Sequence, residues 1–138
     1  MNPSTLVTCK GVADMAIATT LMLKPAILYE SLATRGLSSL TGLHISNAAV
    51  APGFNHSIAC LVASVGLGNI VAAKCGPAAL PPIFAMTSAW SIFSILTCIL
   101  TPQSWGLSSA TLLMGGLVNA LFSLTLYVSE PRLFKSRH

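Results

Sequence analysis

LPPIFAMTSAWSIFSILTCIL, residues 80–100, contains no charged side chain. A helix needs about 20 mainly apolar residues to cross the roughly 30 Å hydrocarbon core of a bilayer, and this stretch has that length. Residues 12–29, 56–73 and 107–128 have the same apolar character. We therefore expect an all-α integral membrane bundle of four transmembrane helices, spanning about residues 11–29, 57–74, 80–101 and 107–128.

The composition excludes most soluble classes of protein. Hydrophobic residues make up 54% of the chain and charged residues 7%, which leaves too few polar side chains to coat a soluble globule. The four spans and their connections use nearly every residue, so we expect residues 1–138 to form a single transmembrane domain in contact with membrane lipids. The net charge of +4 comes from few, scattered basic residues, and we expect no nucleic acid partner.

The distribution of basic residues predicts the orientation. Lys24 and Arg35 fall at one end of the expected bundle, and five basic residues fall at the end that holds both termini: Lys10, Lys74, Arg132, Lys135 and Arg137. Positive charge near span ends is retained in the cytoplasm, so both termini are expected there. The first apolar run contains Asp14 and exceeds signal-peptide length, which favours a retained span over a cleaved signal.

Residues 30–55 form the only sizeable loop. Its leucines gather within about 140° of a helical wheel, opposite Arg35 and two serines, which suits a short helix lying in the membrane interface. Two glycines, Gly36 and Gly42, weaken this pattern. An irregular loop packed over the mouth of the bundle is the alternative, and the sequence leaves both open.

Small residues are expected to hold the helices together, because lipid supplies no hydrophobic drive for helix association. Such residues recur in the last three spans: Ala59, Ser64, Gly66, Gly68, Ser91, Ser94, Gly115, Gly116, Asn119, Ala120 and Ser123. Close packing is the favoured role of these residues, and lining a substrate path is the other.

Asp14 is the leading candidate for chemistry. It is the only acidic residue well inside an apolar segment, where an ionised carboxylate is costly unless it is paired, hydrated or neutralised. A functional carboxylate buried near Asn69 or Asn119 is one interpretation. A residue one turn inside the cytoplasmic boundary that reaches water is the other.

His56 is the second catalytic candidate, since imidazole exchanges protons near neutral pH and this residue begins the second span. An interfacial hydrogen-bonding role is its alternative. The candidate substrate-binding residues are polar groups at the bundle mouth or inside spans: Glu30, His44, Asn55, Asn69 and Asn119. The two amides inside spans are expected to face the bundle interior and bond across helices.

No known cofactor or metal motif occurs in the chain. We therefore expect no cofactor, and two histidines near the mouth are too few for a metal site. The four cysteines form no CxxC motif and are expected to be reduced and structural. Asn55-His56-Ser57 matches the glycosylation sequon, although its nearness to the bilayer argues against modification.

Four segments carry a resemblance to a known group: GVADMAIATTLMLKP, TRGLSSLTGLH, APGFNHSIACLVASVGLGNIVAA and WGLSSATLLM. With these segments the chain resembles the small four-helix integral membrane proteins of filamentous fungi. Many of those proteins are uncharacterised, and some occur in natural-product gene clusters. The resemblance covers nearly the whole chain. It rests on the pattern of apolar spans and on the amino-acid sequences of the loops, and it includes no catalytic signature. It implies an endomembrane location, such as the endoplasmic reticulum, and metabolism of an apolar molecule.

Two functions of different classes remain open from sequence. One is a role in lipid or terpenoid/polyketide-type secondary metabolism, as an enzyme on an apolar small molecule or an accessory to one, with Asp14 or His56 as the acid–base group. The other is a non-catalytic scaffold or subunit that packs against a membrane protein partner or further copies of itself. A solute carrier is a third, less favoured function, because the spans hold too few ionisable groups to outline a path for a solute or ion.

Overall fold

The computed structural model describes residues 2–101 and 103–131. Within them the chain folds as α1 (Pro3–Leu23), α2 (Ala26–Tyr29), α3 (Leu32–Thr41), α4 (Pro52–Lys74), η1 (Pro77–Ala79), α5 (Leu80–Leu100), η2 (Gln103–Trp105) and α6 (Ala110–Ser129). Four of these segments are long and apolar enough to cross a membrane. The predicted all-α bundle of four membrane-compatible helices is therefore confirmed.

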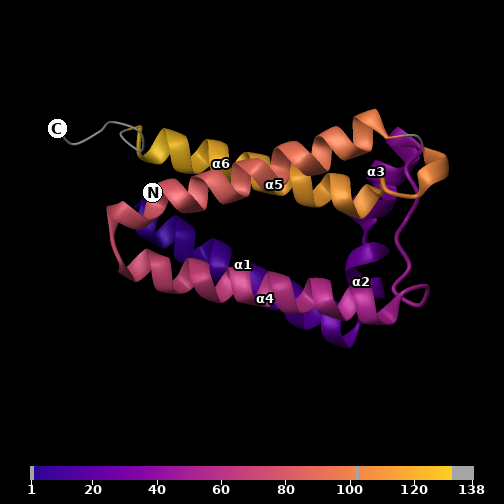
Figure 1. Ribbon diagram of the computed structural model, residues 1–138, viewed down its shortest axis with the longest axis horizontal. Coiled ribbons are helices and arrows are strands. Elements are labelled where there is room, and N and C mark those ends of the chain that lie inside the picture. The colour runs from indigo at the N-terminus through magenta and orange to yellow at the C-terminus, as the bar shows by residue number, and fades with distance from the viewer. Residues whose placement is uncertain (1, 102, 132–138) are drawn as a thin grey trace.

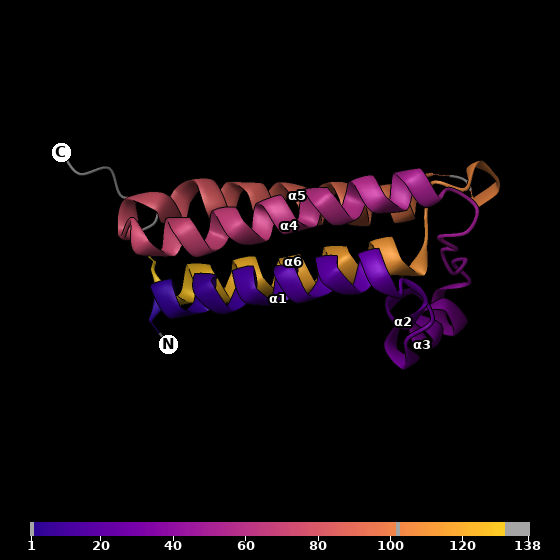
Figure 2. The ribbon, with the colours of Figure 1, turned by 90° about the horizontal axis from the view of Figure 1, so that it is seen from below.

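The four long helices lie along one axis and alternate in direction (Figure 1). α1 lies beside α4, and α5 lies beside α6, so the bundle consists of two antiparallel pairs (Figures 1 and 2). The start of α1, the α4–α5 connection and the end of α6 lie at one end, which we call the terminal end. The short helices α2 and α3 lie at the opposite end, which we call the loop end.

α1 begins eight residues before the predicted span, at Pro3 instead of residue 11. The Asn2 side chain accepts a hydrogen bond from the Ser4 amide, and proline at the first helical position has no amide hydrogen to satisfy. The helix ends at Leu23, because the residue before a proline disfavours the helical conformation and Pro25 follows Lys24. Asp14 consequently lies near the middle of α1 and not one turn inside its boundary.

The other long helices start at similar local signals. Pro52 opens α4 five residues before the predicted start, and Ser109 caps α6 by accepting a hydrogen bond from the Leu112 amide. Gly76, with φ of 81°, makes the turn that lets α5 reverse onto α4. These signals are local, so sequence places the helix centres better than their ends.

Small residues bring the helices of each pair together. A Cβ atom added to Gly11 would lie 2.6 Å from the Gly66 carbonyl oxygen, and one added to Gly66 would lie 2.9 Å from the Gly11 carbonyl oxygen. In the second pair, a Cβ atom on Gly116 would lie 3.1 Å from Ser94 Cβ. Gly68 has no such neighbour, so the expectation that it is a tight packing position is wrong.

The two pairs meet mainly through an apolar cluster near the terminal end. Its buried members come from all four long helices: Leu6, Val7, Ala73, Leu80, Ile83, Phe122 and Leu126. At the loop end the pairs are joined through the connections instead, since the Ala110 amide donates to the His44 carbonyl oxygen at 3.0 Å.

The outer surface of the bundle is apolar. Large hydrophobic side chains are exposed on every long helix, including Val12, Leu67, Phe93 and Leu121. Such a surface is unfavourable in water and is solvated by lipid acyl chains. The exposed side chains therefore agree with an integral membrane protein.

The first loop contains a short helix, α3, residues Leu32–Thr41, which is one of the two alternatives that the sequence leaves open. Two of its polar side chains bond to the adjoining segments, since the Thr34 hydroxyl donates to the Leu28 carbonyl oxygen and the Ser38 hydroxyl donates to the Leu43 carbonyl oxygen. Among its other polar residues, Arg35 and Ser39 are exposed. Leu32 and Leu40 point outward, at 91% and 85% exposed, whereas Leu37 is partly buried.

Candidate functional site

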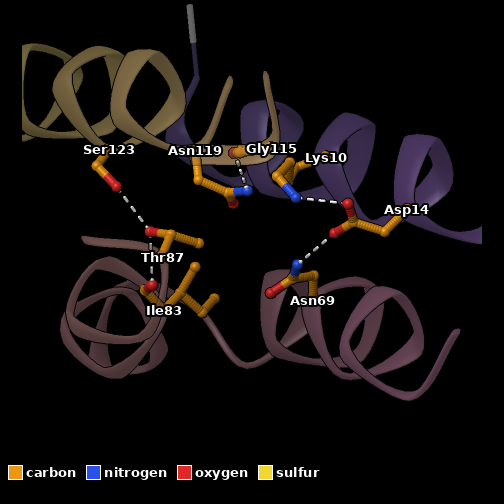
Figure 3. Close-up of polar contacts among 8 residues, drawn as sticks. All are labelled: Lys10, Asp14, Asn69, Ile83, Thr87, Gly115, Asn119 and Ser123. Atoms are coloured by element: carbon orange, nitrogen blue, oxygen red, sulfur yellow. Dashed lines mark hydrogen bonds and ion pairs between the residues drawn. The ribbon is translucent and has the colours of Figure 1, made fainter. Parts of the chain in front are cut away.

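A buried polar cluster joins α1 and α4 inside the bundle (Figure 3). Lys10 donates to Asp14 Oδ1 one turn along the same helix, and Asn69 Nδ2 of α4 donates to Asp14 Oδ2 at 3.2 Å. Asp14 and Asn69 are 5% and 1% exposed. The amide of Asn69 therefore faces the interior and bonds across helices, as the sequence predicts.

Lys10 makes the cluster electrically neutral. Its ammonium group forms the ion pair with Asp14 and lies 5.8 Å from the centre of the Phe122 ring on α6. A cation over the face of an aromatic ring is attracted by the ring quadrupole. The lysine thus links both helix pairs.

The Asn69 carbonyl oxygen Oδ1 is buried and has no hydrogen-bond partner among the described residues. The Asp14 carboxylate differs, because each of its oxygens accepts a hydrogen bond. A carboxylate held by a cation and an amide is suited to tying helices together. A general base instead needs an oxygen within hydrogen-bond reach of the proton that it abstracts.

His56 lies far from this cluster. It is exposed in the first turns of α4, and Asn69 follows it by 13 residues on the same helix. At about 1.5 Å per residue the two are separated by about 20 Å. Since Asn69 contacts Asp14, the two catalytic candidates do not share a site.

Asn119 also does not reach the cluster's carboxylate. Its Nδ2 donates to the Gly115 carbonyl oxygen of its own helix at 2.9 Å, so the expected bond across helices is not the one that it makes (Figure 3). The polar tie between α5 and α6 is formed by Thr87 and Ser123, whose hydroxyl oxygens lie 2.8 Å apart. Sequence reasoning missed this pair, because two hydroxyls in apolar spans carry no distinguishing spacing.

The remaining candidates lie at the loop end and do not form one site. The Glu30 carboxylate forms an exposed ion pair with Arg35 at 2.8 Å, and the His44 side chain is exposed. The Asn55 amide donates to the Leu21 carbonyl oxygen at 3.0 Å and accepts a hydrogen bond from the Tyr29 hydroxyl. Asn55 therefore fixes the end of α1 against the start of α4.

Burial raises the pKa of the Tyr29 hydroxyl above its ordinary value of 10.0. The protonated hydroxyl that donates to Asn55 is accordingly favoured in the folded protein. By linkage, its contribution to stability is fully present below pH 10 and declines as the pH rises through the folded-state pKa.

Two clefts lie at opposite ends of the bundle and not beside Asp14. The cleft at the terminal end has a volume of about 190 Å³ and lies between Ser4, Ala73 and Glu130. The cleft at the loop end has a volume of about 370 Å³ and lies between α2 and residues 46–49. Neither brings Asp14 and His56 together.

The comparisons with known proteins supply no relative. No protein-family model, no curated protein and no solved structure matches this chain.

Proposed function

We propose that this chain is a non-catalytic scaffold or accessory subunit of a larger membrane assembly. The observation that carries the proposal is that both carboxylate oxygens of Asp14 already accept hydrogen bonds, from Lys10 and Asn69, where α1 contacts α4. Asp14 and Asn69 join α1 to α4, Thr87 and Ser123 join α5 to α6, and the exposed apolar surface is free to pack against another membrane protein.

A test of assembly distinguishes a subunit from a protein that acts alone. An epitope-tagged chain, extracted from its native membrane in digitonin, is expected to migrate on native electrophoresis as a particle well above its own 14.3 kDa plus detergent. Crosslinking before extraction should give the same partner band. Migration as a single copy under both conditions would contradict the proposal.

The rival function is an enzyme, or an accessory to one, in lipid or terpenoid/polyketide-type metabolism. It is favoured by the loop-end cleft, where Glu30, Tyr29 and Asn47 present polar groups beside the apolar Ile27. Deletion of the gene followed by untargeted metabolite profiling tests this rival, since an enzyme leaves an accumulated apolar precursor. The resemblance to fungal membrane proteins motivates the endoplasmic reticulum as the membrane to examine first.

For the orientation we propose cytoplasmic termini. Without Lys10, whose charge is paired inside the bundle, the sequence still has Lys74 and three basic residues after α6 against the two of the first loop and its preceding span.

Cysteine accessibility tests this orientation. In a variant without native cysteines, Ala78→Cys in the α4–α5 connection should react with an impermeant maleimide added outside sealed microsomes. Ser39→Cys on α3 should react only after the membrane is permeabilised. Both positions are exposed, so the reverse labelling pattern would refute the orientation.

A further inference from the structure

The loop-end cleft carries a surplus of positive charge. Lys24 lines it and has no ion pair within residues 2–101 and 103–131. Glu30 also lines it, but the Arg35 guanidinium lies 2.8 Å from its carboxylate and balances its charge. An anionic group entering this cleft would therefore meet the unpaired ammonium of Lys24.

The cleft also continues into the lipid-facing surface. Ile27 forms part of its wall and is 59% exposed, and Leu23, in the last turn of α1, is 76% exposed. Leu23 is the last residue of a membrane-compatible helix, and Ile27 follows it in α2, so both lie where acyl chains give way to headgroups. Lys24 follows Leu23 directly, which is the position from which a lysine reaches headgroup phosphates.

Two leucines of α3, a helix at the same end of the bundle as the cleft, also face outward. Leu32 and Leu40 are almost fully exposed, whereas the Thr34 side chain is buried against the protein. The outer side of α3 therefore carries these two leucines beside the exposed Arg35 and Ser39, a mixture that suits a helix at the membrane interface.

We propose that the loop-end cleft binds the headgroup phosphate of an anionic phospholipid. Lys24 supplies the cation, and Ile27 and Leu23 contact the upper acyl chain. The polar side chains of Ser46 and Asn47, which also line the cleft, supply hydrogen-bonding capacity for the glycerol and phosphate oxygens. The proposal goes beyond the scaffold function and does not rest on it.

Native mass spectrometry of the full chain, released from detergent with added dioleoyl phosphatidylglycerol, tests the site. We expect one tightly retained lipid, and we expect Lys24→Gln to weaken its binding about tenfold, the loss of one charge-assisted contact. Lys24→Arg should largely restore binding. Lys74→Gln is the matched control, since Lys74 is an exposed cation at the terminal end of α4 and should leave binding unchanged.

Three outcomes would overturn the proposal. Unchanged retention by Lys24→Gln would show that this cation is not the site, and equal retention of dioleoyl phosphatidylcholine would show that anionic charge is not recognised. Displacement of the lipid by millimolar inorganic phosphate would assign the cleft to a soluble anion. Circular dichroism melting of each variant without added lipid verifies that it remains folded.

Discussion

Replacing Gly11 with alanine should cost about 2 kcal/mol or more of the free energy of unfolding, the scale of a methyl group forced into a closely packed contact. The added Cβ atom would meet the Gly66 carbonyl oxygen at 2.6 Å and the Ile70 amide nitrogen at 3.0 Å. Both atoms belong to the backbone of α4, so relief requires the helices to move apart. Titration with sodium dodecyl sulfate in mixed micelles measures the change.

Gly68→Ala is the matched control for this variant. Gly68 lies on α4 two residues from Gly66, and a Cβ atom added there has no neighbour within 4 Å. The substitution should leave the unfolding free energy unchanged or slightly raised, because alanine is the better helix former. Equal losses for the two variants would mean that α1 and α4 are not joined at Gly11.

Removing the charge of Asp14 alone should destabilise the fold by about 3 kcal/mol, because it leaves the Lys10 ammonium buried without its partner. The side chains of Lys10 and Asp14 are only 10% and 7% exposed, so solvent screens the pair weakly. Asp14→Asn combined with Lys10→Met should recover most of the loss. The double variant has no buried charge, and the new amide oxygen still accepts from Asn69.

The exposed Glu30–Arg35 pair is the control for this double-mutant cycle. Its side chains are 53% and 58% exposed, and exposed pairs contribute about 0–1 kcal/mol. We expect a coupling energy below about 1 kcal/mol for Glu30→Gln with Arg35→Met. Additive losses at Lys10 and Asp14 would show that their contact is not an interaction on which the fold depends.

The fold was largely predictable from sequence because hydropathy over 20 residues reflects the solvent around each helix. The N-terminal boundary of α1 was not predictable in this way, because it depends on a helix cap. Asn2 and Pro3 start the helix in a segment that is too polar for hydropathy to include in the span. The amphipathic pattern of residues 32–43 left a short helix and an irregular loop both open, and the structure contains the helix, α3. Its inward Thr34 could not be predicted, because it depends on the hydrogen bond to the Leu28 carbonyl oxygen.

The site was predictable only in part. An acidic residue in a span needs a partner, which pointed to Asp14 and Asn69, and the structure brings them within 3.2 Å. Lys10 stands four residues before Asp14, a spacing that places the two on one side of a helix and was available as a signal. The separation of His56 from Asp14 was available from the predicted topology, because Asp14 lies early in the first span and His56 begins the second span at the opposite end of the bundle.

The central claim is that Asp14 joins helices and performs no acid–base chemistry. It is tested most directly by expressing the Lys10→Met, Asp14→Asn double variant in a deletion strain, at wild-type abundance. The metabolite profile and the native size of the assembly are then measured. We predict restoration of both to the wild-type pattern, since the variant keeps the helix contact and removes the exchangeable proton. A folded, abundant double variant that assembles normally but leaves the deletion's metabolite profile in place would contradict the claim.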